Sequence, residues 1–303
     1  MRWLKNILIY SSCSFLLYSC NNKPEHPDTV NSGTIEVSAD ETFQPIIEEE
    51  LKVFDSDKQD AHVNIHYKPE AECFKDFYDG KAKLILVTRP LSKMETDVFA
   101  QKKIWTSSRA LAREGIAVIL NTASADTFLS KDALRGILTG IYKKKYTVVF
   151  DNQESSTISY ITDSILKSGK LGGNVYAAKG SKDLVDYVAK NPDAIGFVGL
   201  SYVSDNNDPG NTGAFIKSVR VAAVQNDSTG EFLQPYQAYI ALKTYPLTRT
   251  LYSINSESYR GLATGFEGFL TGQRGQLIFF HDHLFPVISE MVIRQAEVNN
   301  SPQ

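Results

Sequence analysis

The residues best suited to chemistry lie in a polar turn between a predicted strand and a predicted helix. Residues 146–150 are β-branched and aromatic, as in a buried strand, and isoleucines recur at helical spacing from Ile158 onward. The turn between them ends in three hydroxyl residues, Ser155, Ser156 and Thr157. Because the first N–H groups of a helix lack partners and carry the positive end of its dipole, such hydroxyls can help to bind an anion. A simple helix cap is the alternative interpretation.

Three comparable units of strand and helix come earlier in the chain. Strands are predicted at residues 34–38 and 61–67, where apolar and polar residues alternate, and at the apolar run 84–88, and each runs into a helix-like segment. Ser92 and Glu95 have the spacing of a capping box at the start of the third helix. This succession predicts an α/β layer whose helix N-termini lie along one edge of the sheet, where such folds bind ligands.

Length and composition indicate one large or two medium globular domains. The chain has 303 residues, of which 42% are hydrophobic and 22% are charged. Its formal charge of -3 argues against a nucleic-acid partner, since no basic stripe is available to neutralise phosphates. The single basic run, at residues 143–145, is interpreted as a solvated turn.

The N-terminus has the features of a targeting segment. Arg2 and Lys5 precede an apolar run at residues 7–17, and the small Ser19 stands before Cys20. This segment resembles a lipoprotein signal peptide, which implies removal of residues 1–19 and a lipid on Cys20. An ordinary signal peptide or a short anchor are the alternatives, although the run is short for a membrane span. Residues 20–33 are rich in Asn, Pro, Asp and Ser and are predicted to form a flexible tether.

Cysteine usage agrees with an exported protein that has no disulfide framework. Cys13 would leave with the signal peptide and Cys20 would carry lipid, so Cys73 remains alone. We expect Cys73 to be a small buried residue rather than a nucleophile.

Six motifs in register resemble the PstS-like phosphate-binding proteins of ABC importers, from about residue 34 to the C-terminus. They are the first loop at 37–45, the "SRPLS..E" element at 88–95, the "GIAVIVN" strand at 115–121, the "L..IF.G" helix at 134–140, the "SGT" loop at 155–157 and the "AIGY/FVG" strand at 194–199.

The resemblance implies an α/β protein with the two-lobe type 2 periplasmic-binding-protein fold. Two crossover hinge strands would join the lobes, the first at residues 116–121 and the second near 236–242. Lobe 1 would comprise residues 34–118 and 239–303, and lobe 2 residues 119–238. The implied function is a lipid-anchored, monomeric solute-binding protein on the periplasmic side of a membrane, which captures phosphate or a similar oxyanion between its lobes for an ABC permease.

The same resemblance implies a set of ligand-binding residues. They are Ser38, Thr42, Thr88, Ser155, Ser156 and Thr157 as hydroxyl donors, with Arg89 as the cation.

Several departures from the family pattern add further candidates. The second family loop holds Glu72 and Cys73 in place of a Ser-Gly cradle, and Lys83 replaces the family aspartate. The arginine that usually precedes the "SGT" loop is absent, and Phe150 or Asp151 stands there. Lys83, Glu72 and Cys73 are therefore added to the candidate site, and a carboxylate facing the cleft would weaken anion binding.

Two other functional classes compete with solute binding. An envelope scaffold or sensor that keeps the fold but has lost or changed its ligand would explain the altered loop. An enzyme is less well supported, since neither His62 with His66 nor His281 with His283 has a recognisable catalytic partner or third metal ligand. We therefore predict no catalytic activity, no cofactor and no metal.

Overall fold

The computed structural model describes residues 26–167, 169–205 and 214–287. The predicted signal peptide and Cys20 lie outside these residues. Within the described part, no helix is long and apolar enough to cross a membrane.

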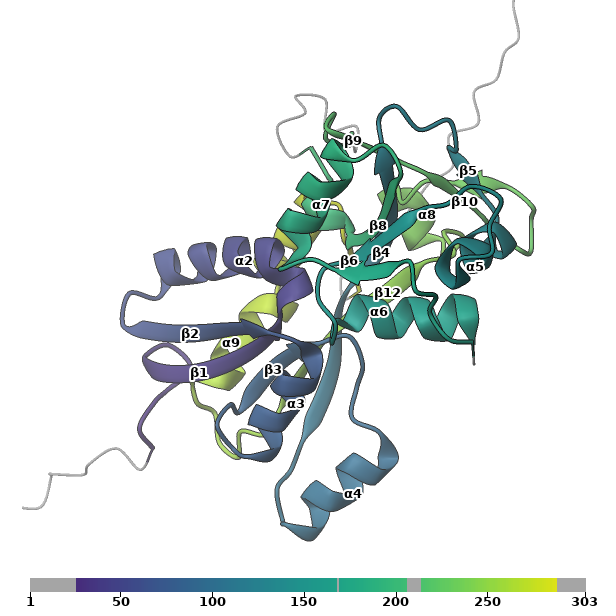
Figure 1. The fold of residues 1–303 in the computed structure, drawn as a ribbon. Coiled ribbons are helices and arrows are strands. Elements are labelled where there is room, and N and C mark those ends of the chain that lie inside the picture. The colour runs from purple at the N-terminus through teal and green to yellow at the C-terminus, as the bar shows by residue number, and fades with distance from the viewer. Residues whose placement is uncertain (1–25, 168, 206–213, 288–303) are drawn as a thin grey trace, which may run out of the picture.

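One ten-stranded sheet runs through both halves of the molecule, as Figure 1 shows. Its central path is β2-β1-β3-β12-β4-β8-β6-β7, and β9 and β13 also pair with β4. The strands on the lobe 1 side are β1 (Gly33–Asp40), β2 (Ala61–Lys68), β3 (Leu84–Val87), β12 (Thr248–Asn255) and β13 (Phe285–Pro286). Those on the lobe 2 side are β6 (Thr147–Phe150), β7 (Val175–Ala177), β8 (Ala194–Gly199) and β9 (Val219–Val221). The long strand β4 (Ser107–Asn121) belongs to both.

Helices cover both halves of the sheet. Lobe 1 carries α2 (Gln44–Asp57), α3 (Glu70–Tyr78), α4 (Lys93–Gln101), α9 (Leu262–Thr271) and α10 (Gln273–His281). Lobe 2 carries α5 (Lys131–Thr139), α6 (Ser156–Ile161), the π-helical η3 (Thr162–Leu166), α7 (Ser181–Lys190) and the single turn η4 (Leu200–Tyr202). It also carries a three-stranded sheet of β11 (Phe232–Leu233), β10 (Ala223–Gln225) and β5 (Phe128–Leu129), and the short helix α8 (Gln237–Ala241).

Local sequence signals explain several helix ends. Pro45 lies in the first turn of α2, where its missing N–H leaves no partner unsatisfied. The predicted capping box of Ser92 and Glu95 begins α4, with both reciprocal hydrogen bonds present. Gly140 ends α5 in the left-handed conformation, at φ 79°.

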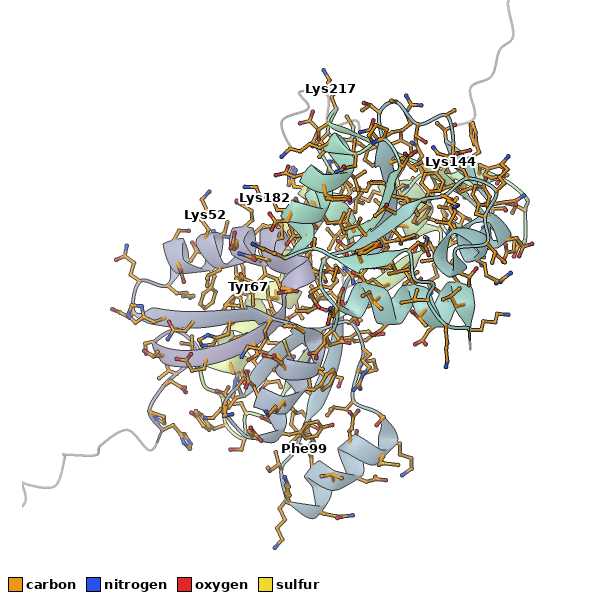
Figure 2. The ribbon with its side chains drawn as sticks, viewed as in Figure 1. Lys52, Tyr67, Phe99, Lys144, Lys182 and Lys217 are labelled. Carbon is orange, nitrogen blue, oxygen red and sulfur yellow. The ribbon has the colours of Figure 1, made fainter. Side chains whose placement is uncertain are left out.

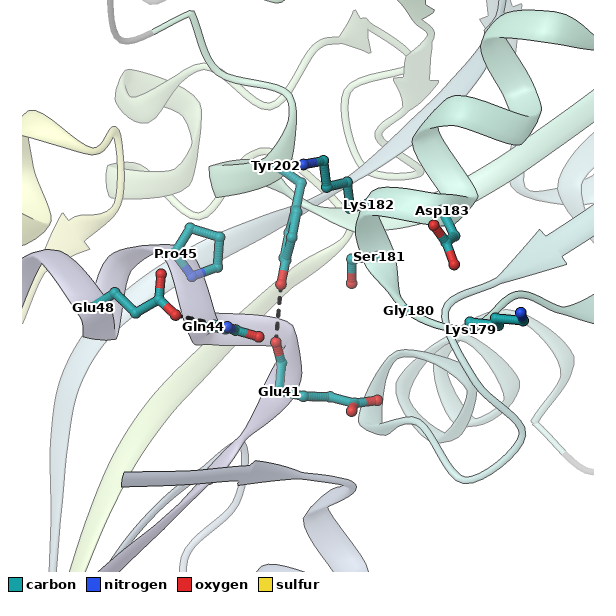
Figure 3. Close-up of a pocket in the computed structure, with 10 residues that line it drawn as sticks. All are labelled: Glu41, Gln44, Pro45, Glu48, Lys179, Gly180, Ser181, Lys182, Asp183 and Tyr202. Atoms are coloured by element: carbon teal, nitrogen blue, oxygen red, sulfur yellow. Dashed lines mark hydrogen bonds between the residues drawn. The ribbon is translucent and has the colours of Figure 1, made fainter. Parts of the chain in front are cut away.

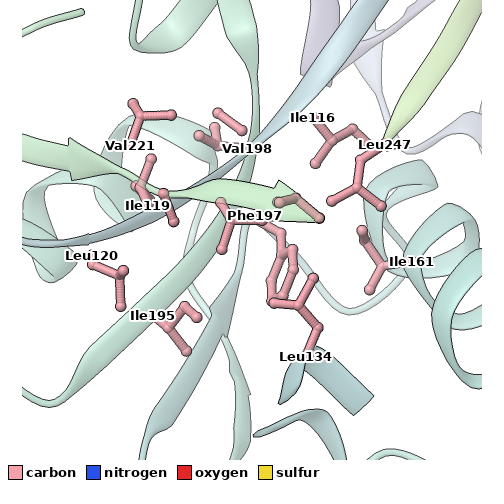
Figure 4. Close-up of a cluster of buried hydrophobic side chains, with 14 of the residues drawn as sticks. Ile116, Ile119, Leu120, Leu134, Ile161, Ile195, Phe197, Val198, Val221 and Leu247 are labelled. Carbon is pink, nitrogen blue, oxygen red and sulfur yellow. The ribbon is translucent and has the colours of Figure 1, made fainter. Parts of the chain in front are cut away.

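The hydrophobic clusters divide between the two lobes. One cluster gathers the buried residues between Ile116 and Leu247, with Phe197 and Phe150 stacked at a centroid distance of 5.2 Å. Figure 4 shows β8 and β4 contributing to this core beside Ile161 from α6. Two further clusters, built from the remaining segments, fill lobe 1. Each lobe therefore has a hydrophobic core of its own.

The crossovers differ in part from the sequence prediction. β4 passes from one core into the other between Ala112 and Ile116, just before the predicted crossover at residues 116–121. The second predicted crossover strand, at 236–242, is wrong, because the chain forms helix α8 there. The chain returns to lobe 1 through Leu247 and β12, which pairs antiparallel with β4 from Gly115 onward. The apolar residues of α8 are compatible with a strand or a helix over so short a run, which explains the incorrect prediction of a strand.

Candidate functional site

Thr42 is held at the carboxyl end of β1 by a buried carboxylate. Asp40 caps the single turn η2 (Glu41–Phe43), and its Oδ1 accepts hydrogen bonds from the Thr42 backbone N–H at 2.9 Å and from Thr42 Oγ1 at 2.8 Å. Both residues are buried. The predicted first loop thus fixes the Thr42 hydroxyl toward lobe 2.

The hydroxyl residues of the "SGT" loop form the start of α6. Ser155 caps this helix, since its Oγ accepts from the Thr157 backbone N–H at 3.0 Å. Ser156 and Thr157 are buried in the first turn, and Ser156 Oγ lies 3.5 Å from Thr42 Oγ1 of the other lobe. The structure therefore assigns Ser155 the capping role that the alternative interpretation gave it, and brings Ser156 and Thr157 to the lobe boundary.

A buried arginine on β12 joins these hydroxyls. Arg249 donates from Nη2 to Thr42 Oγ1 at 3.0 Å, and from Nη1 to Ser156 Oγ at 3.0 Å and to Thr157 Oγ1 at 3.3 Å. Its guanidinium also lies 4.5 Å from the centroid of the Phe43 ring. One cation thus bridges both lobes through three hydroxyl groups.

The charge of Arg249 is balanced by Glu114 on β4. Glu114 Oε2 accepts from Arg249 Nε at 3.0 Å and from Nη2 at 2.8 Å, and neither side chain is more than 1% exposed. Burial raises the pKa of Glu114, an effect that the guanidinium opposes. A Cβ at Gly199 would lie 2.6 Å from Glu114 Oε1, so the last glycine of the "AIGY/FVG" strand makes room for this carboxylate.

The two lobes touch around this cluster. Tyr202 of lobe 2 donates to the backbone oxygen of Glu41 at 3.0 Å, and Asn152 donates to the Glu41 carboxylate. A cavity of about 470 Å³ opens beside Glu41 along the boundary, between the first turns of α2 and α7 (Figure 3). Since Thr42 and Arg249 are at most 4% exposed, a ligand would reach them only when the lobes separate.

Ser38 and Thr88 lie on neighbouring strands but bond to carboxylates instead of the arginine. Ser38 Oγ donates to Asp76 Oδ2 at 2.7 Å, a carboxylate that Lys68 also contacts at 2.5 Å. The backbone N–H and the hydroxyl of Thr88 both donate to Glu70 Oε1, at 2.5 and 2.7 Å. Together with Thr42, which donates to Asp40, three of the predicted hydroxyl donors therefore already bond to carboxylates.

Arg89 and Lys83 are not part of the cluster. Arg89 forms a two-pronged ion pair with Glu95, at 2.9 Å for each contact, and packs over the Phe74 ring. Lys83 precedes β3, at the opposite end of this strand from Thr88, and donates to the Tyr259 hydroxyl at 3.2 Å. The predicted cation Arg89 is therefore wrong for this cluster, and Arg249 is the cation there. Arg89 instead forms its ion pair with Glu95, a residue of the capping box of α4.

The carboxylate near the second loop is also not the predicted one. Glu72 is exposed, whereas Glu70, two residues earlier, binds Thr88. Cys73 is buried in a lobe 1 core, as expected for a small hydrophobic residue, and burial raises the pKa of its thiol. It has no contact with the arginine cluster.

Other carboxylates surround the hydroxyls and remain short of partners. Within the described residues, Asp40 Oδ2 and both oxygens of Asp151 are buried without a hydrogen-bond partner of ordinary geometry. Burial raises the pKa of Asp151, which the Ser155 side chain and the charge of Arg249 only partly offset. Burial, together with the charge of Asp151, likewise raises the pKa of Glu41. The site thus offers one cation, several hydroxyls and several proton acceptors.

The sequence contains a signal for the two residues that were missed. Arg249 alternates with Leu247 and Leu251 on the buried face of its strand, and Glu114 stands directly before the apolar strand from Gly115. A charge within a buried strand is costly unless it is paired, so two such charges of opposite sign predict an internal ion pair.

This arrangement is suited to holding a small charged group rather than to bond chemistry. Buried hydroxyls, a guanidinium and a helix N-terminus can donate hydrogen bonds to an oxyanion. Among the described residues, no group of three or more His, Cys, Asp or Glu side chains is placed to hold a metal ion.

The chain belongs to the PBP superfamily. The family model of the PBP superfamily domain matches residues 24–274. The predicted fold class, α/β with two lobes, is confirmed, and so is the resemblance to PstS-like proteins.

Individual relatives lie at low identity but cover most of the chain. The phosphate-binding protein PstS of Staphylococcus saprophyticus is 23% identical over 270 residues, which are 85% of this chain and 81% of that protein. A Clostridium perfringens protein assigned as a phosphate ABC transporter substrate-binding protein, solved with bound phosphate, has a TM-score of 0.71 at 20% identity, covering 84% of this chain and all of that one. The ABC-type phosphate transport receptor of Vibrio cholerae has a TM-score of 0.65 at 17% identity, with 83% and 99% coverage. These structures share the fold of this chain.

Proposed function

We propose that this protein binds phosphate, or a closely similar oxyanion, between its lobes for uptake by an ABC-type transporter. The observation that carries the proposal is the convergence of Thr42, Ser156 and Thr157, from both lobes, on the buried Arg249. The relatives named for phosphate binding or phosphate transport support the same ligand. Opening of the lobes would expose these donors, and closure on the anion would bury it.

The surrounding carboxylates favour a protonated oxyanion. An ionised carboxylate only accepts hydrogen bonds, so the unpartnered oxygens of Asp40 and Asp151 suit a ligand that donates a proton. Phosphate carries one or two protons near neutral pH, whereas sulfate carries none. We therefore infer a preference for phosphate over sulfate.

Titration calorimetry of the lipid-free chain tests the proposal. We expect heat of binding with phosphate and at least tenfold weaker binding of sulfate. Thr157→Val should weaken phosphate binding by about tenfold, because loss of one hydrogen bond to a charged group costs about 1.5 kcal/mol. Thr96→Val, which removes an exposed hydroxyl on α4, is the matched control and should leave affinity unchanged. Absence of heat with phosphate up to millimolar concentrations would contradict the proposal.

A second candidate function is an envelope scaffold or sensor that has lost or changed its ligand. The observation in its favour is that carboxylates already occupy the donors, with Glu70 on Thr88 and Glu114 on Arg249. Calorimetry that detects no oxyanion, together with co-purification of a stable protein partner, would establish this alternative. A phosphate ion retained through purification would exclude it.

We further propose that a lipid on Cys20 anchors the chain to a membrane, with the lobes on its periplasmic side. The proposal is supported by the basic, apolar and small residues that precede Cys20. Metabolic labelling with palmitate should mark the wild-type chain and leave Cys20→Ser unmarked. Equal labelling of both proteins would contradict the proposed lipid anchor.

A further inference from the structure

The helix α4 and the turn after it expose a set of apolar side chains that no other part of the described chain covers. Met94 and Val98 lie one turn apart on α4, and Ile104 and Trp105 follow it. Their exposures are 78%, 38%, 38% and 67%. We call Met94, Val98, Ile104 and Trp105, with Lys102 and Lys103, the α4 tip.

The α4 tip is a fixed projection of lobe 1. Phe99, on the other side of the helix, is 2% exposed and packs against the rings of Phe77 and Tyr78 at centroid distances of 5.1 and 5.3 Å. Figure 2 places Phe99 where α4 meets the rest of lobe 1. The capping box and its ion pair to Arg89 secure the start of the helix. Packing thus holds the helix while its apolar stripe faces outward.

The charge of the α4 tip is positive. Both acidic residues of the helix are paired, Glu95 with Arg89 and Asp97 with Lys93, each at 2.9 Å. Lys102 and Lys103 are exposed, and neither forms an ion pair with any residue that the structure describes. A tryptophan and aliphatic side chains beside uncompensated lysines are typical of surfaces that lie at an anionic membrane interface.

The start of the folded chain lies at the same end of the lobe 1 sheet. Ser107 pairs with Asn255, and Asn255 pairs with Leu84 at the start of β3. β1 begins at this end as well, and His26 stacks on Tyr259, in the loop after β12, at a centroid distance of 3.8 Å. Three strand spacings, roughly 15 Å, separate β1 from β4 across the sheet. In Figure 1 the start of the described chain, which leads into β1, and α4 both lie on the side of lobe 1 away from lobe 2.

The predicted tether comprises residues 20–33, but the structure packs His26 on Tyr259 and begins β1 at Gly33, so only the part before His26 can separate this end from a membrane. Six residue steps separate Cys20 from His26, which span at most about 20 Å when fully extended. A lipid on Cys20 would hold the end of lobe 1 that carries the α4 tip within that distance of the bilayer. An anchored surface then needs only weak intrinsic affinity, because the tether raises its effective concentration.

We propose that the α4 tip contacts the anionic lipid surface of the membrane that anchors the chain, with Trp105 in the interfacial region and Lys102 and Lys103 at the headgroups. This inference rests on the lipid anchor proposed above and is independent of phosphate binding. Contact through lobe 1 would orient the protein on the membrane while lobe 2 opens and closes.

Trp105 provides a direct measurement. The sequence has two tryptophans, Trp3 and Trp105, so a chain that begins at residue 21 retains Trp105 alone. The residues of the three hydrophobic cores are all retained in this chain, since they lie between Ile35 and Leu284. With vesicles of 70% phosphatidylcholine and 30% phosphatidylglycerol, we expect a blue shift of the emission maximum and co-sedimentation of the protein.

Charge reversal separates the α4 tip from a general electrostatic effect. Lys102→Glu combined with Lys103→Glu should weaken vesicle binding by at least about tenfold, since each lysine near an anionic surface contributes roughly fivefold. Lys143→Glu combined with Lys145→Glu makes the same change of charge on lobe 2, where Lys144 lies far from α4 (Figure 2), and should leave binding unchanged. Both variants should bind phosphate as the parent does.

Three outcomes would overturn the proposal. They are no blue shift or co-sedimentation with anionic vesicles, equal losses in the two double variants, and capture of the α4 tip by a protein partner with no affinity for vesicles. Palmitate labelling of the same strain tests the lipid anchor separately from the contact between the α4 tip and the membrane. Phosphate calorimetry tests ligand binding separately from both.

Discussion

Replacing Arg249 by methionine is expected to abolish phosphate binding and to lower the free energy of unfolding by about 3–5 kcal/mol. The arginine contacts the hydroxyls of both lobes, so the variant loses the cation of the proposed site. The stability loss has a separate cause, because Glu114 remains buried without its partner. Urea unfolding and phosphate calorimetry on the same preparations measure the two effects.

A double variant separates these effects. Arg249→Met with Glu114→Gln removes both charges of the ion pair, so Glu114 is no longer left buried without its partner, and we expect most of the lost stability to return while phosphate binding stays absent. Arg109→Met is the matched control, since this half-exposed arginine lies 3.9 Å from Glu267 and should contribute less than about 1 kcal/mol. Phosphate affinity within threefold of wild type in Arg249→Met would show that the ligand binds elsewhere.

Much of the fold could be predicted because its signals are local. The strands β3 and β8 are runs of apolar residues, β1 begins with alternating apolar and polar residues, and the capping box of α4 lies within four consecutive residues. The second crossover could not be predicted, because five residues such as those of α8 are compatible with a strand or a helix until tertiary packing decides.

The site residues that were predicted lie in loops that the family motifs mark. The site residues that were missed are those whose place depends on an ion pair between distant parts of the chain. Thr42, Ser156 and Thr157 stand in recognisable loops. The choice between Arg89 and Arg249 as the central cation depends on which carboxylate each one meets. Arg89 meets Glu95, six residues later on α4, whereas Arg249 meets Glu114 on the adjacent strand β4. Arg249 and Glu114 lie 135 positions apart in the sequence, so no local spacing encodes their pairing.

The largest gain in stability is expected from Glu50→Gln. Glu50 lies on the inner face of α2, is 0% exposed, and neither of its carboxyl oxygens has a hydrogen-bond partner among the described residues. Burial, with a smaller contribution from the charge of Asp282, raises the pKa of Glu50 to about 10. The folded chain therefore holds a proton that the unfolded chain releases near the ordinary carboxyl pKa of about 4.3.

The direction of the pH dependence follows from this difference. Because the native state binds more protons than the unfolded state between these two pKa values, the stability of the wild-type protein falls as the pH rises through this window. Glutamine resembles the neutral carboxylic acid and cannot ionise in the unfolded chain. Glu50→Gln should therefore gain about 1 kcal/mol at pH 5 and about 4 kcal/mol at pH 7 relative to wild type.

Urea unfolding at several pH values between 5 and 8 measures this gain. Glu49→Gln is the matched control, because the adjacent carboxylate is exposed, with its side chain 58% accessible, and pairs only loosely with Lys52 at 3.7 Å. Its free energy of unfolding should stay within about 0.5 kcal/mol of wild type at every pH. A constant difference between Glu50→Gln and wild type across this range would mean that Glu50 does not carry the proton. In that case the cost of burying its side chain would have to be met by another group near α10, since a carboxylate at this depth cannot remain both charged and unpaired.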